Sequence, residues 1–511
     1  MSWLRRIVTI QEKKQFHPHV LLLFSGFVGL VRLFGEWFLG GVDVELPLVH
    51  GLGFAAFYWS CFFVYGTVMS TLLGEDWRRC VNVVLVGIFL GVLPPLVDTI
   101  WYGLGKFSYS YVFNFPKGWP WLLFSPATGM PLGECVVLWT TVVVCVAYAW
   151  VKRPTVGRVA LVAVLAYFAA VFNGGVVPTV ARAIVDRAGW AGGHLWVVLT
   201  LLQVLVALVL WLRFQPSFAK HLVKRLLHAA PFVAMACVGA SLVGPLSVNV
   251  PIYGGGLALL FAVALTQNDH HDRSEDEAVG RLFVVGGAEV AMMNITAGWV
   301  CLVLCIAGSI VGFILTVVWI VSFLYSYPFY RAKRYFPSNL KIEGVWGLSA
   351  FMVGVVAQLE HFGGGQPSWS LTGARQALKL PLDWTIVIAA ALAFGGHTLV
   401  AIAKDWKDVE GDLQVGNQTV FTLAHRRGWD VRRIRWLTTV AVSACLALPW
   451  LLLAFAGRLP WAATLLGGLF VGWAISTQKS EHSASDFRKL LLCATFMLAT
   501  LATLLHFGVA G

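Results

Sequence analysis

Two short stretches of this 511-residue chain hold nine of its 25 acidic residues. They read NDHHDRSEDE at 268–277 and DWKDVEGD at 405–412. In each stretch, three oxygen-bearing side chains follow helical spacing, namely Asn268, Asp272 and Asp276 in the first and Asp405, Asp408 and Asp412 in the second. Residues three or four apart lie on one face of a helix, so each trio forms a row of oxygen atoms. Such rows suit Mg²⁺, a hard cation that leaves coordination positions open for phosphate oxygens.

The simplest alternative is that each stretch is a solvated, charged loop. Against this, both stretches fall at the same expected face of the membrane, and each carries basic side chains, Arg273 in the first and Lys404 and Lys407 in the second. Crowded carboxylates repel one another unless a cation lies among them. The pattern favours one anion-binding and cation-binding site over two unrelated loops.

The composition indicates what kind of structure must position these residues. Hydrophobic residues make up 58% of the chain and charged residues 12%, whereas soluble domains carry about 25% charged residues. This excludes a soluble enzyme and a disordered or fibrous protein. The apolar runs are too long and unbroken for the alternating strands of an outer-membrane barrel, so the fold class is all-α, a polytopic helical membrane protein.

About fifteen apolar runs approach the roughly 20 residues that cross a bilayer as a helix. Six lie in the first part of the chain, at about 18–40, 53–74, 80–102, 134–150, 159–180 and 192–212. Nine lie in the second, at about 226–247, 251–268, 284–306, 309–328, 342–360, 383–403, 434–455, 459–476 and 488–508. The polar linker RFQPSFAKHLVKR at 213–225 separates them. We therefore expect a six-helix unit over 1–212 and a nine-helix unit over 220–511.

The basic residues give a topology. With the N-terminus in the cytoplasm, 29 of the 37 Lys and Arg residues fall in cytoplasmic segments and 7 in segments on the other side. This is the bias that the positive-inside rule requires, and it places both acidic stretches at the cytoplasmic face. The net charge of +12 thus reflects topology and contact with anionic membrane lipids, and no nucleic-acid-binding module is indicated. The nine cysteines lie in or beside apolar segments without ligand spacing, so neither disulfides nor a zinc site is expected.

Three motifs resemble those of the UbiA superfamily of intramembrane prenyltransferases. NDHHDRSED at 268–276 resembles its first motif, NDxxDxxxD, and KDWKDVEGDLQVGNQT at 404–419 resembles its second, KDxxDxxGDxxxGxxT. YSYPFYRAKRYFP at 325–337 is similar to the loop after the fourth helix of the family. The resemblance covers about 220–511 and fits the nine-helix count.

The resemblance implies a lipid-open cavity that holds a polyprenyl diphosphate and Mg²⁺ at its cytoplasmic end. The expected metal and catalytic residues are Asp272, Asp276, Asp408 and Asp412, with Asp405 as a further ligand. The expected diphosphate-binding residues are Asn268, Arg273, Lys333, Arg334 and Lys404. Departure of the neutralised diphosphate would generate an allylic cation. The apolar and aromatic walls of the cavity would protect this cation from water. The implied function is transfer of an isoprenoid chain to an aromatic or lipid-like acceptor.

Three other functions are weighed against transfer. An intramembrane terpene cyclase of the same superfamily would use the same cation chemistry without an acceptor. A cation transporter would continue its charges across the bilayer, whereas these aspartates stop at one face. A diiron or zinc enzyme built on His270, His271 and His425 lacks the histidine boxes of that class. Many family members have an Arg-Pro-rich stretch where this chain reads EAVGRLFVVGG at 277–287, and this difference leaves the acceptor open. The sequence does not give the donor chain length or the oligomeric state.

The first 212 residues resemble no family that we can name. Charged side chains within spans are costly and indicate function unless they are paired. Arg32 and Glu36 are spaced to pair with each other, Asp98 follows a Pro-Pro pair, and Glu134 begins a span. The unit is interpreted as a structural partner, a guide for a long lipid, or a second active site. In the second unit, four isolated polar groups either face the acceptor or make interhelical hydrogen bonds, and they are Glu289, Glu360, His361 and His397.

Overall fold

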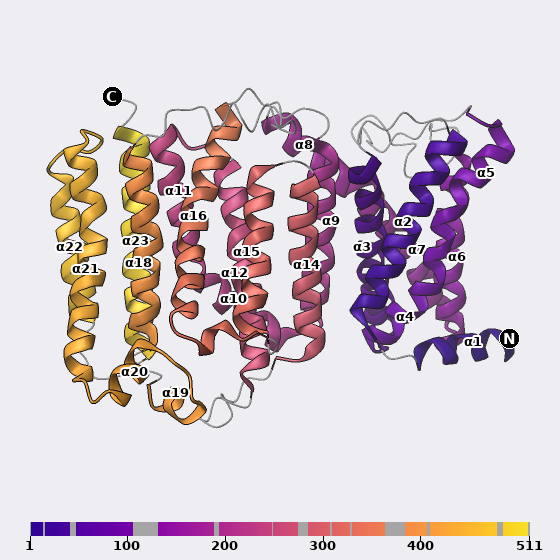
Figure 1. Ribbon diagram of the computed structural model, residues 1–511. Coiled ribbons are helices and arrows are strands. Elements are labelled where there is room, and N and C mark those ends of the chain that lie inside the picture. The colour runs from indigo at the N-terminus through magenta and orange to yellow at the C-terminus, as the bar shows by residue number, and fades with distance from the viewer. Residues whose placement is uncertain are drawn as a thin grey trace. The chain divides into compact units, whose positions relative to one another are not determined.

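The computed structural model is all-helical, with no strand among the residues that it describes (Figure 1). It describes the chain except residues 1, 14–15, 41–46, 106–130, 189–193, 248, 274–284, 307–308, 328–329, 363–383, 406–408, 478–483 and 509–511. Within the described ranges, thirteen helices are long and apolar enough to cross a membrane, and two shorter apolar helices cover Ile310–Ser326 and Ala463–Ser476. Each of the fifteen expected spans coincides with one of these helices. The chain is an integral, multi-pass membrane protein.

The chain folds into two compact units, Met1–Ala219 and Lys220–Gly511. The helices of the first unit are α1 (Ser2–Glu12), α2 (Pro18–Gly40), α3 (Pro47–Leu73), α4 (Trp77–Gly87), α5 (Leu93–Tyr102), α6 (Leu132–Lys152), α7 (Val156–Val171), α8 (Val177–Ala188) and α9 (His194–Arg213). A 3-10 segment, η1 (Ile88–Val92), joins α4 to α5, and a π-helical segment, η5 (Phe172–Val176), joins α7 to α8. Helix α10 (Pro216–His228) contains the boundary between the units.

Helix α3 is the centre of the first unit. It packs against α2, α4, α7 and α9. Its Trp59, Phe62 and Phe63 are among the largest fully buried side chains of the chain. A helix that is apolar on all sides must be surrounded by other helices or by lipid, and here the neighbouring helices cover it.

The second unit contains the remaining helices. They are α11 (Ala230–Val243), α12 (Asn249–His271), α14 (Gly287–Ile306), α15 (Ile310–Ser326), α16 (Ser338–Phe362), α18 (Trp384–Asp405), α19 (Val409–Val415), α20 (Val420–Arg426), α21 (Val431–Phe455), α22 (Ala463–Thr477) and α23 (Ala484–Gly508). Helices α11 and α16 approach most closely, because a Cβ atom at Gly354 would lie 1.8 Å from the carbonyl oxygen of Ala236. Small residues at such crossings let membrane helices pack backbone to backbone.

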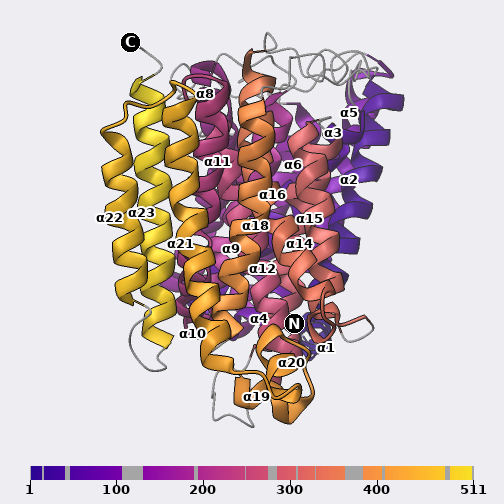
Figure 2. The same cartoon turned by 60° about the vertical axis from the view of Figure 1, so that its left-hand side comes forward.

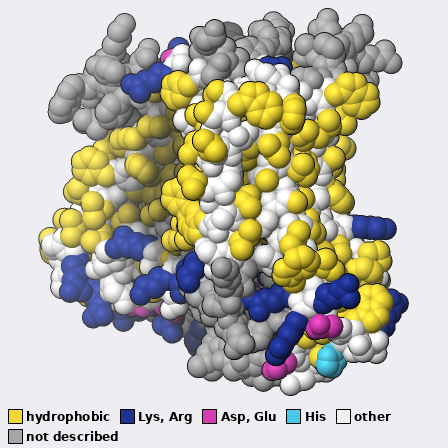
Figure 3. All heavy atoms as spheres, turned by 90° about the vertical axis from the view of Figure 1, so that its left-hand side faces the viewer, with side chains coloured by type: hydrophobic (Ala, Val, Ile, Leu, Met, Phe, Trp, Pro, Cys, Tyr) yellow, Lys and Arg dark blue, Asp and Glu magenta, His cyan; other side chains and the backbone are white. Residues whose placement is uncertain are grey.

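The short helices α19 and α20 lie at one end of this bundle, as Figures 1 and 2 show. Figure 3 shows a band of hydrophobic side chains across the middle of one face, with Lys and Arg gathered toward one end. Helices α21 to α23 contribute exposed apolar side chains to the surface, including Trp436, Phe455 and Phe496. An apolar band with a basic edge is the surface that a membrane and its anionic headgroups favour.

Candidate active site of the C-terminal unit

A cavity of about 930 Å³ lies inside the second unit. Aromatic and aliphatic side chains line most of it, among them Phe232, Phe261 and Trp346. Charged and amide side chains line one part of it, namely Asn268, Asp269, Asp272, Lys333, Lys404, Asp405, Glu410 and Asp412. A large apolar cavity with convergent polar groups is the usual form of a site for a hydrophobic ligand with a charged head.

The C-terminal end of α12 supplies the first group of oxygen atoms. The Asp272 backbone N–H donates to the Asn268 carbonyl at 2.9 Å, which continues the helical turn and places the two side chains four residues apart. The hydroxyl of Ser326, at the end of α15, donates to the Asn268 side-chain oxygen at 3.2 Å. Asn268 and Asp272 are thus both held at the wall of the cavity.

Two basic side chains from the loop after α15 pair with Asp272. The Lys333 ammonium forms an ion pair with the Asp272 carboxylate, and an Arg331 Nη atom lies 3.2 Å from the same oxygen. Arg331 also donates to the His271 carbonyl at 3.1 Å. Of the two diphosphate-binding cations that the sequence predicts in this loop, Lys333 lines the cavity, whereas Arg334 is absent from its lining. The backbone carbonyl of Arg334 instead accepts a hydrogen bond from the Gln418 N–H at 3.1 Å, which ties this loop to the second acidic stretch.

The second acidic stretch reaches the cavity from α18 and α19. Lys404 and Asp405 end α18, and Asp412 lies on α19. The Asn417 side-chain N–H donates to the Asp412 carboxylate at 2.8 Å. Gly416 has φ of +79°, a left-handed conformation that other residues rarely adopt, so the chain turns there and Asn417 folds back on Asp412. The predicted residues Asn268, Asp272, Lys333, Lys404, Asp405 and Asp412 therefore line one cavity.

The other predicted site residues do not line it in the described structure. Asp276 and Asp408 lie outside the described residues. Arg273 is described and is exposed, away from the cavity lining. Among the described residues, no group of three or more His, Cys, Asp or Glu side chains lies close enough to hold a metal ion.

A buried network on Asp269 was not predicted from the sequence. Arg225 Nε donates to the Asp269 carboxylate at 3.0 Å, and His221 Nε2 lies 2.7 Å from the same oxygen. Both partners come from α10, and α11 lies between α10 and α12 in the chain. The sequence shows that His221 and Arg225 lie four residues apart on one helical face, but this spacing does not identify Asp269 as their partner.

The isolated polar groups fall into different roles. His397 Nε2 lies 3.2 Å from Glu343 across α16 and α18, and both line the cavity. The His397 ring also packs against Phe232, with centroids 4.9 Å apart. Glu360 instead accepts from the Ile310 N–H at 2.7 Å and from the Ser309 hydroxyl, so it caps the start of α15.

The remaining histidines of the sequence analysis show no ligand geometry. His270 Nδ1 lies 2.8 Å from the Val285 carbonyl, and the His271 ring packs against Tyr327. Glu289 is half-buried in the first turn of α14, outside the cavity lining. Nothing is described for the His361 side chain. Of the four isolated polar groups, His397 is thus the one found in the cavity wall.

Comparison with known proteins gives the family of this unit. Residues 285–501 match the model of the UbiA prenyltransferase family, and residues 1–284 lie outside the match. No curated protein matches the chain. A solved structure of a UbiA homolog from Archaeoglobus fulgidus, bound to DMAPP and Mg²⁺, aligns with 57% of this chain and 99% of its own, at 17% identity and a TM-score of 0.36. The predicted resemblance of the C-terminal unit to the UbiA prenyltransferase family is confirmed over residues 285–501.

Proposed function

We propose that the C-terminal unit is a Mg²⁺-dependent prenyltransferase that moves an isoprenoid chain from a polyprenyl diphosphate to an aromatic or lipid-like acceptor. One observation supports this above all. The cavity of this unit gathers Asp272, Asp405, Asp412, Lys333 and Lys404 in one part and aromatic side chains in the rest. A polyprenyl diphosphate has the same division into a highly charged head and an apolar chain.

The donor set fits Mg²⁺. Six carboxylates and three Lys or Arg side chains are among the described residues that line the cavity, namely Asp269, Asp272, Glu343, Asp405, Glu410 and Asp412 against Arg225, Lys333 and Lys404. This excess of oxygen ligands suits a hard divalent cation. Asn268, Asp272, Asp405 and Asp412 would hold it, with Asp276 and Asp408 of the same stretches as further ligands. When bound, Mg²⁺ would neutralise charge on the diphosphate and make it a better leaving group.

The side chains of the cavity then have separate tasks. Lys333 and Lys404 bind diphosphate oxygens with charge-assisted hydrogen bonds. As the bond between the prenyl C1 and its oxygen breaks, the electron pair leaves with the diphosphate and an allylic cation forms. Phe232, Phe261 and Trp346 exclude water from that cation, and their ring faces attract it.

The acceptor completes the reaction. Its electron pair forms the new bond to the prenyl C1, and its proton departs to restore charge balance. The hydrogen-bonded pair Glu343 and His397 lies in the aromatic wall of the same cavity. It offers a polar group for an acceptor hydroxyl and a base for the departing proton.

We further place the polar part of the cavity at the cytoplasmic face. The support is the distribution of Lys and Arg along the chain. Asp430 begins α21 beside the basic segment that follows α20. A single added cysteine at Asp430 should react with a membrane-impermeant thiol reagent in inside-out vesicles and not in right-side-out vesicles, and the opposite pattern would reverse the topology.

The reaction is tested on the purified full-length chain in lipid nanodiscs with labelled farnesyl or geranylgeranyl diphosphate. We expect Mg²⁺-dependent release of diphosphate that rises when a suitable acceptor is added. Release with formation of a cyclic hydrocarbon in the absence of acceptor would identify a terpene cyclase instead. No release with any chain length, acceptor or divalent cation would contradict both activities.

A further inference from the structure

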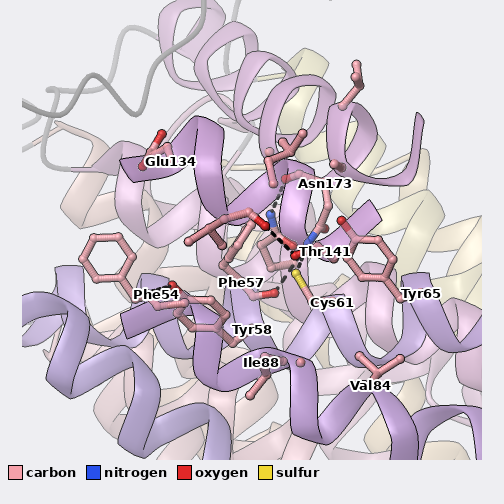
Figure 4. Close-up of a pocket in the computed structure, with 18 of the residues that line it drawn as sticks. Phe54, Phe57, Tyr58, Cys61, Tyr65, Val84, Ile88, Glu134, Thr141 and Asn173 are labelled. Atoms are coloured by element: carbon pink, nitrogen blue, oxygen red, sulfur yellow. Dashed lines mark hydrogen bonds between the residues drawn. The ribbon is translucent and has the colours of Figure 1, made fainter. Parts of the chain in front are cut away.

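A second cavity, of about 420 Å³, lies inside the N-terminal unit (Figure 4). Three membrane-spanning segments each supply a stripe of residues at helical spacing. The stripes are Phe54, Phe57, Tyr58, Cys61, Tyr65 and Met69 on α3; Cys80, Val83, Val84, Gly87, Ile88, Gly91 and Pro94 on α4, η1 and α5; and Glu134, Val137, Leu138, Thr141, Val144, Cys145 and Tyr148 on α6. Residues that recur every three or four positions share one helical face.

The shape of this cavity suits a linear chain. The α3 stripe runs from Phe54 to Met69, which at 1.5 Å per residue is about 22 Å along the helix. The α6 stripe, from Glu134 to Tyr148, has nearly the same length. A volume of 420 Å³ beside stripes of this length can hold one linear chain. Glycines keep it open, because a Cβ atom at Gly87 or Gly174 would meet no atom within 4 Å.

One end of the channel is charged. Arg32 and Glu134 line it, and an Arg32 Nη atom lies 2.8 Å from the Glu134 carboxylate. Arg32 also pairs with Glu36 on its own helix, as its spacing predicted. Behind them, Asp98 is fully buried and accepts from the Gly133 N–H at 2.7 Å. This cluster therefore contains three carboxyl groups and one guanidinium among the described residues.

Such a cluster discriminates between head groups. A phosphate, diphosphate or carboxylate would add negative charge beside Glu134, in surroundings of low dielectric where like charges repel strongly. A hydroxyl group adds no charge and can donate a hydrogen bond to the carboxylate. The charges thus favour a neutral, hydroxyl-bearing head.

A second observation concerns the polar groups further along the channel. The π-helical segment η5 turns Asn173 into the cavity wall, and single-turn π-bulges are frequent at functional sites. The polar groups of Asn173 are hydrogen-bonded to Ser60, Cys61 and Gln203. Tyr65 also lines the cavity and is 7% exposed, but its hydroxyl has no hydrogen-bond partner in the described part of the chain. Figure 4 shows this hydroxyl on the side of the ring toward Asn173.

We propose that the N-terminal unit binds one molecule of a neutral, linear lipid alcohol, with its hydroxyl at Glu134 and its hydrocarbon chain along α3, α4 and α6. A polyisoprenoid alcohol and a straight-chain fatty alcohol share this chemistry. The site lies entirely within the N-terminal unit and requires no prenyl transfer in the C-terminal unit.

The test is photo-crosslinking of the full-length protein in nanodiscs, without Mg²⁺ or diphosphate. A diazirine derivative of geranylgeraniol should label peptides of α3, α4 or α6. Unlabelled geranylgeraniol should reduce this labelling, and geranylgeranyl phosphate should be at least about tenfold weaker as a competitor, which corresponds to 1.4 kcal/mol of discrimination. Octadecanol is the second competitor. Competition by geranylgeraniol alone identifies an isoprenoid, and equal competition by both alcohols identifies a linear alcohol of either kind.

Variants connect the labelling to this cavity. Gly87→Leu and Gly174→Leu each place a side chain in the channel and should lower labelling about tenfold. Gly157→Leu is the matched control, because Gly157 is exposed on α7 and its Cβ would also meet no atom within 4 Å. Glu134→Gln removes one negative charge and should bring geranylgeranyl phosphate within about threefold of the alcohol.

Three results would overturn the proposal. They are labelling that no alcohol competes, labelling of Gly87→Leu and Gly174→Leu at the level of Gly157→Leu, and competition by the phosphate equal to that by the alcohol in the unsubstituted protein. None of these depends on turnover. Failure of the lipid site is therefore distinguishable from failure of the prenyltransferase assay, which is measured separately by diphosphate release.

Discussion

The cavities of the two units have similar apolar linings, but they differ in which cations accompany their carboxylates. Both are lined mainly by aromatic and aliphatic side chains, and both have carboxylates in one part. In the C-terminal cavity, Lys333 and Lys404 stand among the carboxylates, together with amide oxygens. In the N-terminal cavity, the cation of the cluster is Arg32, which is held between Glu36 and Glu134. Two lysines beside the carboxylates permit an anionic head, whereas a single arginine between two carboxylates does not.

The cavities also differ in the room they offer. The C-terminal cavity has about twice the volume, 930 Å³ against 420 Å³. Helix α18 forms one of its walls, and only 6% of the apolar stretch of this helix is buried inside the structure. A donor and an acceptor must meet in a transferase, so the larger space suits two molecules. The narrow N-terminal channel suits one.

The largest expected effect comes from the carboxylates of the C-terminal cavity, and it should leave ligand binding in the N-terminal cavity unchanged. Asp272→Asn should lower Mg²⁺-dependent diphosphate release by about a thousandfold, because it removes a charge from the part of the cavity that would hold both metal and diphosphate. Labelling of the N-terminal cavity by the lipid alcohol should be unchanged. Steady-state release of labelled diphosphate measures the first effect, and crosslinking yield measures the second.

Asp186→Asn is the control for this substitution, because Asp186 is exposed and pairs only with its helical neighbour Arg182 among the described residues. It should retain full release. A release rate for Asp272→Asn above about a tenth of the unsubstituted rate would contradict the assignment of Asp272.

The second effect tests one of the two lysines that distinguish the C-terminal cavity. Lys333→Met should lower kcat/KM for the diphosphate by about a hundredfold, since one charge-assisted contact to the leaving group is lost. Lys341 is exposed on α16, so Lys341→Met provides the matched control with unchanged kinetics. Equal values for the two variants would mean that Lys333 serves only to pair with Asp272.

A smaller effect concerns the polar pair in the aromatic wall. Glu343→Gln should lower transfer to the acceptor about tenfold while the KM for the diphosphate changes little, because Glu343 holds His397 and not the leaving group. Glu360→Gln on the same helix is the control, because Glu360 caps α15 outside the cavity. Equal loss of activity in both variants would indicate a general effect on α16.

Much of this architecture follows from the sequence because membrane helices obey simple rules. Long apolar runs must form helices to satisfy their backbone in lipid, so thirteen of the fifteen predicted spans are found as helices long enough to cross a membrane and the other two as shorter apolar helices. Helical spacing placed Asn268 and Asp272 together, and this is a local feature that periodicity determines. Asp405 and Asp412 also line the cavity, but they belong to different helices, α18 and α19, so their shared position does not follow from the helical spacing that the sequence suggested.

The partners of those residues could not be predicted, because they depend on how distant helices cross. Lys333 and Arg334 are adjacent and chemically similar, yet only Lys333 lines the cavity. Glu343 meets His397 from 54 residues away. In the N-terminal unit, the pairing of Arg32 with Glu36 was predictable from their spacing, whereas the reach of Arg32 to Glu134 joins residues 102 positions apart.

The smallest expected effects concern the polar groups along the N-terminal channel, which stabilise its wall and are not expected to bind the lipid alcohol. The Ser60 hydroxyl is hydrogen-bonded to Asn173 at 2.9 Å and to Gln203. Ser60→Ala should therefore destabilise the unit by about 1–3 kcal/mol, because it leaves buried amide groups unsatisfied. Lipid labelling should change by less than about twofold, since a satisfied group has no hydrogen bond left to offer.

Tyr65→Phe should leave both properties unchanged. The Tyr65 hydroxyl has no partner within the described residues, and the hydrocarbon chain of the alcohol offers it no hydrogen bond, so the thermal unfolding temperature should stay the same and labelling should change by less than about twofold. Ser25→Ala is the control for stability, because within the described ranges the buried Ser25 hydroxyl bonds only to the Leu21 carbonyl of its own helix. If Ser60→Ala abolished labelling while unfolding at the unsubstituted temperature, the Asn173 cluster would itself contact the ligand, and the alcohol would be bound at mid-channel instead of at Glu134.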